Sequence, residues 1–398
     1  KVLFACFKRK LKNEIKVAQL AGYVSEHAAY HHGEMSLNGT IVTMAQNYSG
    51  SNNVNLLFPS GQFGTRLQGG KDAASPRYIF TRLEQVARAI FHIEDDPLLK
   101  FLDDDGQSIE PDHYVPVIPM VLVNGADGIG TGWSTFIPNY NPRDIIANLR
   151  RMLNEEEMEE IHPWYRGFNG EIIAKTGKDK GSYTVRGAYT DIDENTIEVT
   201  ELPVRVWTQG YKAFLETLLP GAADSKDAGL IKDFKENHTD TQVSFTIVFA
   251  EGKLAEVQGG GGGVYKKMKL ESTMSTTNMN LFNSDCQIVK YENVLDIINE
   301  FRGPRLELYS SRKANMISRV EEEWRRVSNQ VRFILAVVSG ELVVSNRPKS
   351  ELLEALVSAG YDRMNKSADE EEDDDVSDSD LAKGYDYLLG MKLWSLTE

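Results

Sequence analysis

Cysteine is the rarest residue in this sequence of 398 residues, which contains only Cys6 and Cys286. So few thiols exclude a disulfide scaffold and a cysteine-rich zinc site. The sequence has neither an apolar run long enough to span a bilayer nor a secretory signal peptide, so we expect an intracellular, soluble protein with no membrane partner. Its glycine-rich segment at 125–132 lacks the Gly-Lys-Ser/Thr ending of a P-loop, which argues against ATP binding there.

The charge is unevenly distributed along the chain. A net charge of −15 argues at first against a polyanionic partner. Residues 369–380 contribute 9 acidic residues, however, whereas residues 1–100 hold 12 Lys and Arg against 8 Asp and Glu. The first hundred residues are therefore net basic and can bind phosphates. Residues 366–383 are too charged to pack, and we expect them to form a disordered insertion.

The first sixty residues have the pattern of a small helical domain. A chain of this length predicts two or three domains, and residues 1–7 look like a strand or helical turn already under way, so we expect a fragment. Helical spacing predicts one helix around residues 17–24 and a second over about 33–48. We place Met35, Ile41, Val42 and Ala45 on the apolar stripe of the second helix. The polar loop 49–53 and hydrophobic residues 54–58 then indicate a helix-turn-helix with a β wing, a DNA-docking architecture; an unspecialised α+β domain is the alternative.

Farther along, the pattern is mixed α/β and then helical. Prolines near residue 110 suggest a domain boundary. Alternation predicts strands at 170–174, 182–185, 196–200 and 241–249, and helices are expected at 142–153 and 208–219. After residue 293 a heptad seam follows, made of Ile317, Val320, Trp324, Val327, Val331 and Ile334. The glycine run 259–263 predicts flexibility, and Gly303-Pro304 predicts a kink in the long helix.

Two short motifs carry the chemistry. Arg77 directly precedes Tyr78, and the adjacent histidines His31 and His32 lie upstream. A tyrosine phenolate can attack a phosphodiester and hold the strand end covalently if a cation stabilises the transition state. Arginine supplies forked donors to phosphate, and imidazole titrates in the range useful for proton transfer. Neighbouring histidines cannot converge on one metal ion, so we assign no metal site.

A series of motifs occurs in the same order in a known family. They are Val-Ala-Gln-Leu-Ala at 17–21, Tyr-His-His-Gly-Glu at 30–34, Gly-Ser-Asn-Asn at 50–53, Gly-Gln-Phe-Gly-Thr-Arg at 61–66, Gly-Gly-Lys-Asp at 69–72, Ser-Pro-Arg-Tyr at 75–78, Asn-Gly-Ala-Asp-Gly-Ile-Gly-Thr-Gly-Trp-Ser at 124–134 and Glu-Leu-Pro-Val-Arg at 201–205. In this order they resemble eukaryotic DNA topoisomerase II, and the resemblance runs through residue 397. Bacterial gyrase A-type relatives place a proline between the two histidines, which this sequence lacks.

The resemblance implies roles for individual residues. Tyr78 would be the nucleophile that becomes linked to a DNA 5′ phosphate, with Arg77, His31 and His32 at the scissile phosphate. Ile129 would wedge between base pairs and bend the DNA. Further expected DNA contacts are Tyr30, Asn52, Asn53, Arg66, Lys71, Arg205 and Trp207.

The resemblance also implies an α+β multidomain architecture. We expect a winged-helix cleavage domain at 1–110, a mixed α/β tower or shoulder domain at 111–290, and a coiled-coil arm toward a dimer gate at 291–398. The implied partners are double-stranded DNA and a second copy of the chain, in the nucleus. Mg²⁺ and ATP would be bound by domains absent from this chain, so the fragment alone should be inactive. The alternatives are a noncatalytic winged-helix protein that bends DNA and a structural coiled-coil scaffold.

Overall fold

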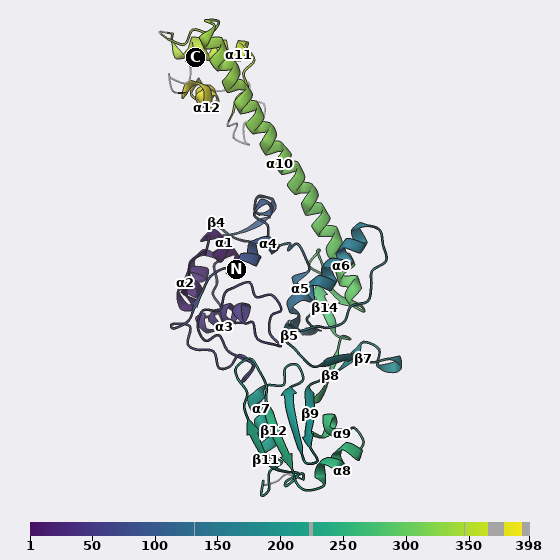
Figure 1. The fold of residues 1–398 in the computed structure, drawn as a ribbon. Coiled ribbons are helices and arrows are strands. Elements are labelled where there is room, and N and C mark those ends of the chain that lie inside the picture. Colours follow the sequence, from purple (N-terminus) through teal and green to yellow (C-terminus); the bar gives the residue numbers. More distant parts are fainter. Residues whose placement is uncertain (131, 223–225, 346, 365–377, 392–398) are drawn as a thin grey trace. The chain divides into compact units, whose positions relative to one another are not determined.

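The protein is a mixed α+β chain whose cores lie in several separate bodies (Figure 1). The computed structural model describes residues 1–130, 132–222, 226–345, 347–364 and 378–391. Within these residues no helix is both long enough and apolar enough to cross a membrane.

Three helices build the first body; the sequence pattern predicts two of them and leaves residues 1–7 open between a strand and a helical turn. They are α1 (Val2–Lys8), α2 (Val17–His27) and α3 (Glu34–Ala45). The side chains of Val17, Leu20, Ala21 and Val24 are all buried, as expected from their spacing. Strands β1 (Ile15–Lys16) and β2 (Phe80–Thr81) form a short antiparallel pair. Residues 54–58, expected to form a wing strand, contribute only one isolated bridge, from Leu57 to Leu83.

The elements that follow this body are short. They are α4 (Gln85–Ile90), a 3₁₀ helix (Ile93–Leu98), and the antiparallel pair β3 (Phe101–Asp104) and β4 (Gln107–Pro111). Phe91 and Phe7 pack against each other here with ring centroids 6.1 Å apart.

Two antiparallel sheets form the second body. The larger has the order β11 (Ile231–Glu236), β12 (Phe245–Phe249), β10 (Thr196–Glu201) and β9 (Ala188–Asp193). Its core also takes side chains from α7 (Thr208–Glu216), α8 (Lys253–Gly259) and α9 (Gly263–Lys267). The smaller sheet has the order β13 (Glu271–Ser275), β8 (Ser182–Arg186) and β7 (Glu171–Ala174). The predicted strands and helices of this region are present, with β12 beginning later than expected.

A third core joins segments far apart in sequence. Its early elements are α5 (Met120–Asn124), the hairpin of β5 (Ala126–Gly130) and β6 (Trp133–Ile137), and α6 (Pro142–Leu153). The later ones are the hairpin of β14 (Met279–Phe282) and β15 (Ile288–Tyr291) and the first turns of α10 (Val294–Val338). Pro142 is the first residue of α6, where a missing N–H costs no hydrogen bond, and the Asn141 side chain accepts from the Arg143 amide.

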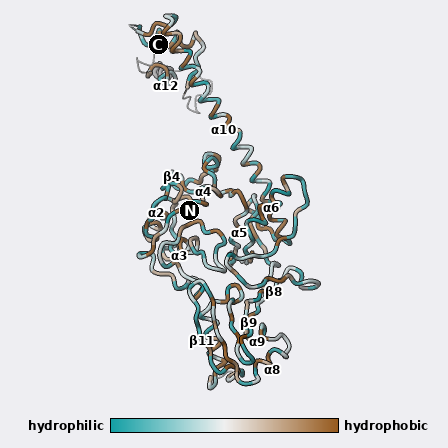
Figure 2. The backbone as a smooth tube through the Cα atoms, viewed as in Figure 1, coloured by the Kyte–Doolittle hydropathy of each residue, from teal (hydrophilic) through white to brown (hydrophobic). Residues whose placement is uncertain are grey.

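Helix α10 extends over 45 residues, and hydrophobic and hydrophilic residues alternate along it (Figure 2). Pro304 lies inside this helix, which continues on both sides of it, and the kink expected at Gly303-Pro304 stays a prediction. The next residue, Arg305, has a buried guanidinium that binds Asp95 and the Val115 carbonyl, each at 2.9 Å, and so ties the first turns of α10 to earlier segments.

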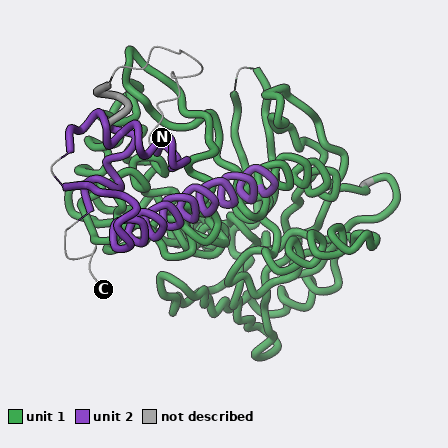
Figure 3. Tube along the Cα trace, turned by 90° about the horizontal axis from the view of Figure 1, so that it is seen from above, with its two compact units in different colours: residues 1–308 green, residues 309–398 purple. Residues whose placement is uncertain are grey.

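The chain divides into two compact units, residues 1–308 and 309–398 (Figure 3). The second has its own core, in which Phe333 of α10 packs with α11 (Lys349–Ser358) and α12 (Asp378–Leu389). Most of the expected disordered insertion lies outside the described residues. Its end, 378–383, belongs to α12, so disorder was the wrong prediction for these residues.

Candidate nucleic-acid interface

Tyr78 projects from a tight turn that is attached to the start of α2. The Tyr78 amide donates to the Ser75 carbonyl at 2.9 Å, closing a turn with Pro76 in the position that proline favours. The first amides of α2 lack partners within the helix, and here the Val17 and Ala18 amides donate to the carbonyls of Ile79 (3.0 Å) and Pro76 (3.1 Å). The phenol is 77% exposed on a backbone that is fixed on both sides of it.

Arg77 shares an open groove of about 690 Å³ with α3 and with the loop 69–76. Lys71 lines the same groove, and within the described part of the chain neither cation forms an ion pair. Both are therefore available to phosphate. Met35, predicted to lie on the buried stripe of α3, instead lines this groove and is 89% exposed.

The two histidines lie in the loop just before α3. Their rings are 4.4 Å apart, and Tyr30 meets His32 edge to face at 5.7 Å. Both histidines are exposed, whereas Tyr30 packs against the first core. Glu34, which begins α3, lines the groove beside Arg77. The 30–34 motif thus leads directly into the wall of that groove.

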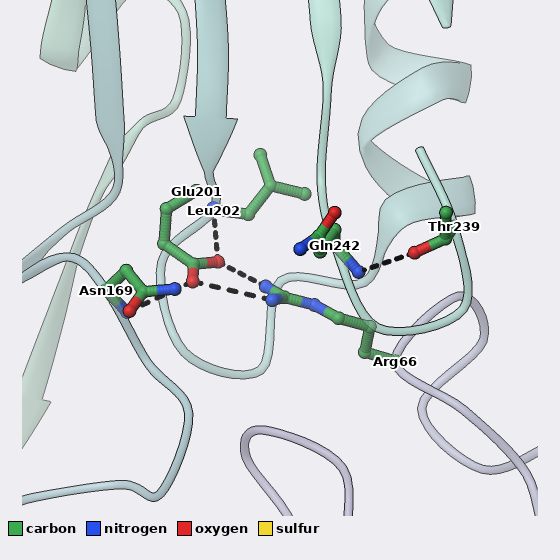
Figure 4. Close-up of polar contacts among 6 residues, drawn as sticks. All are labelled: Arg66, Asn169, Glu201, Leu202, Thr239 and Gln242. Atoms are coloured by element: carbon green, nitrogen blue, oxygen red, sulfur yellow. Dashed lines mark hydrogen bonds and ion pairs between the residues drawn. The ribbon is translucent and has the colours of Figure 1, made fainter. Parts of the chain in front are cut away.

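Arg66 is not available to DNA, contrary to our prediction. Its guanidinium is buried and binds both carboxylate oxygens of Glu201 at the end of β10 (Figure 4). Glu201 is only 1% exposed and also accepts from the amides of Asn169 (3.1 Å) and Leu202 (2.9 Å). Because its guanidinium is buried and bound to both oxygens of a buried carboxylate, Arg66 is a structural joint between the first body and the larger sheet.

Asn53 is also structural. Its side chain is 3% exposed, donates to the carbonyls of Tyr140 (3.1 Å) and Trp164 (3.0 Å), and accepts from the Arg166 amide at 2.9 Å. These bonds use its polar capacity within the protein, and the predicted DNA contact is wrong. The side-chain amide of Asn52 donates to the backbone carbonyls of Thr43 (2.7 Å) and Gln46 (2.9 Å), and these bonds cap the end of α3.

Trp207 is half-buried and packs against two glycines. A Cβ on Gly69 would lie 2.3 Å from the indole ring, and one on Gly50 would lie 3.3 Å from it, so only glycine allows this close approach at position 69. Tyr48 meets the same ring edge to face at 5.8 Å. Burial, with Asp72 nearby, raises the pKa of Tyr48 to about 12. Trp207 therefore packs the second body against the loops of the first.

Ile129 lies near the tip of the β5–β6 hairpin and is 88% exposed. The glycine-rich segment that begins at residue 125 thus contributes to a two-stranded hairpin. Arg205 braces it: its guanidinium donates to Asp127 at 2.7 Å and lies 5.2 Å from the Phe136 ring. A large apolar side chain held on a braced hairpin and left in solvent is suited to insertion into another molecule.

Comparison with known proteins identifies this arrangement. The family model for the A subunit of DNA gyrase/topoisomerase IV matches residues 1–398. The chain belongs to this family, in its eukaryotic topoisomerase II branch. It is 52% identical to DNA topoisomerase 2 of Pisum sativum over 91% of this chain and 24% of that protein. With Homo sapiens DNA topoisomerase 2-beta the identity is 48% over 100% of this chain and 25% of that protein.

A solved topoisomerase II structure has the same fold. The crystal structure of the Plasmodium falciparum topoisomerase II DNA-binding, cleavage and re-ligation domain is 47% identical, with a TM-score of 0.88 over 100% of this chain and 54% of that one. The chain spans about a quarter of the length of the curated topoisomerase II relatives it matches. Among the described residues, no group of three or more His, Cys, Asp or Glu side chains could hold a metal ion.

Proposed function

We propose that this chain is the breakage-reunion part of an ATP-dependent type IIA topoisomerase, in which Tyr78 cuts one strand of a duplex. The observation that carries the proposal is the fixed turn that exposes the Tyr78 phenol next to Arg77 and the groove. The phenol oxygen forms a bond to phosphorus, and the bond from phosphorus to the 3′ oxygen breaks. The DNA 5′ end stays linked to Tyr78, and the 3′ oxygen leaves as a hydroxyl.

Protons and charge need partners in this step. His31 or His32 takes the phenol proton, and a proton returns to the 3′ oxygen. The Arg77 guanidinium stabilises the charge on the phosphorane, and Lys71 binds a flanking phosphate. In the second strand the same step is carried out by the Tyr78 of a second copy.

The remaining residues shape the DNA. Ile129 unstacks a base step, and the cost of a few kcal/mol is offset by a longer wrapped contact. Arg205 holds the hairpin through Asp127, which supports a positioning role. We assign the first body to a winged-helix domain, the sheets to a tower domain, and α10 to the arm toward a dimer gate in the nuclear enzyme. The exposed seam residues of α10, among them Val320 and Trp324, support pairing with a second copy.

Mg²⁺ and ATP would act from upstream domains absent from this chain. The described residues around Tyr78 offer no ligand cluster that fits Mg²⁺. The whole protein passes one duplex through the break in another, which relaxes and decatenates DNA.

Trapping of the covalent intermediate tests the proposal. The full-length protein is incubated with Mg²⁺ and end-labelled duplex DNA and denatured abruptly, and the labelled peptide is sequenced. We expect label on Tyr78, its loss in Tyr78→Phe, and its retention in Tyr309→Phe, a control at another exposed tyrosine. Bound DNA without any adduct would refute the proposal and favour a noncatalytic protein that bends DNA.

A further inference from the structure

A second cavity, of about 530 Å³, lies in the first unit and shares no lining residue with the groove beside Arg77. Its walls come from α1, the segment 113–121, the β14–β15 hairpin and the first turns of α10. Most of the lining is apolar, including Phe91, Met120, Phe282 and Phe301. The volume falls within the range of small-molecule sites.

The walls of this cavity are held in place by contacts behind them. Tyr114 meets Phe91 edge to face at 5.7 Å, which fixes one aromatic wall. Arg305 donates to Asp95 and to the Val115 carbonyl, each at 2.9 Å, and so ties the first turns of α10 to the 113–121 segment. A ligand therefore meets a preformed site and avoids the cost of ordering one.

One carboxylate breaks the apolar lining. Glu300 lines the cavity and is half-buried, and its Oε2 accepts from the Tyr291 hydroxyl at 2.5 Å. A phenol donates a single proton, so the other carboxylate oxygen is left for another donor. Within the part of the chain that the structure describes, no Lys, Arg or His forms an ion pair with Glu300. An anion at the edge of an apolar cavity favours a cationic partner.

We propose that this cavity binds a small amphiphilic cation, with an aromatic or aliphatic body between the apolar walls and one protonated amine on Glu300. The cavity offers a single carboxylate together with His113, so a monocation fits better than a polyamine. Because α10 contributes Ile297, Glu300, Phe301 and Pro304 to the wall, an occupant would brace the base of that helix. The proposal does not rest on the DNA-cleavage chemistry.

Fluorescence titration of the purified 398-residue chain tests the proposal. The probe is dansylcadaverine, which joins an apolar naphthalene to a primary ammonium, and the control is dansylamide, which has no ammonium. We expect dansylcadaverine to bind at least about tenfold more tightly. Glu300→Gln should remove this preference, whereas Glu292→Gln, at an exposed carboxylate outside the cavity, should keep it.

The thiol of Cys286 locates the bound probe. Cys286 is exposed and lines the cavity, whereas the other cysteine, Cys6, is buried. Bound dansylcadaverine should slow bimane labelling of Cys286 in proportion to occupancy, and Ser284→Phe at the mouth should weaken binding without unfolding an exposed turn. Equal affinity for both dansyl compounds, equal affinity in Glu300→Gln, or unprotected labelling would each overturn the proposal.

Discussion

Removing Arg66 should destabilise the joint between the first body and the larger sheet without a direct loss of DNA contact. Arg66→Met leaves the Glu201 carboxylate buried with only two amide donors, from Asn169 and Leu202. Breaking a buried ion pair by removing one partner costs about 3–5 kcal/mol. Both side chains are almost fully buried, so solvent screening reduces this figure little.

Hydrogen exchange of residues 201–211 is the suitable assay, because a chain of two compact units need not unfold in one step. The Leu202 amide bonds to Glu201 and the Gln209 amide to the Leu67 carbonyl, so both report on the joint. A loss of about 3 kcal/mol should speed their exchange by about a hundredfold or more. The matched control is Arg186→Met, which breaks the more exposed Arg186–Glu271 pair and should cost below about 1 kcal/mol.

A double substitution separates the ion pair from the fold around it. Glu201→Gln keeps one acceptor oxygen for the backbone amides, so Arg66→Met combined with Glu201→Gln should cost less than the sum of the two single changes. The reasoning is refuted if Arg66→Met accelerates exchange no more than Arg186→Met does, or if the double change is additive.

Four further outcomes follow from the site. Lys71→Gln should lower the salt dependence of DNA binding by about one phosphate contact, a slope change of about 0.9, with unchanged stability by urea titration. Asn53→Ala should cost at least about 1–3 kcal/mol in urea yet leave that slope unchanged, because its side chain is buried. Burial raises the pKa of the folded Tyr48 phenol to about 12, so the unfolded phenol ionises first and the stability of the chain falls between about pH 10 and 12. Tyr48→Phe should remove this part of the alkaline destabilisation, which urea midpoints measured across that pH range would show. Thiol titration should count one reactive cysteine in the native chain and two after denaturation, because Cys6 is buried and burial raises its pKa to about 12. Two fast-reacting thiols in the native chain would contradict this.

Local signals in the sequence predicted the elements well, because spacing within a helix depends on near neighbours. The buried positions of α2 and the bounds of α6 follow from such spacing. Met35 was misplaced because helical spacing alone does not exclude it from the buried side. Asn38 and Val42, three and seven residues farther on, are both buried on the same side of α3. Met35 lies in the first turn, where it lines the open groove instead.

Long-range partners could not be predicted in the same way. Arg66 meets Glu201 at a separation of 135 residues, and Asn53 meets the Trp164 carbonyl at 111. An arginine or asparagine in a motif of a DNA enzyme looks like a DNA contact until its partner is known. The partners of Arg305 are just as distant, since Asp95 and Val115 lie about 200 positions upstream.

The attachment of the Tyr78 turn to α2 has a mechanical consequence. If the phenol holds a severed DNA end, tension in that strand is applied to the backbone between Pro76 and Ile79. The carbonyls of these residues bond to the first amides of a helix whose apolar face is in the core. Load on the strand would therefore be spread over the packed interior of the first body and would not stretch a flexible loop. The broken end would keep its position while a second duplex passes, and it would still face the 3′ hydroxyl that must reseal it.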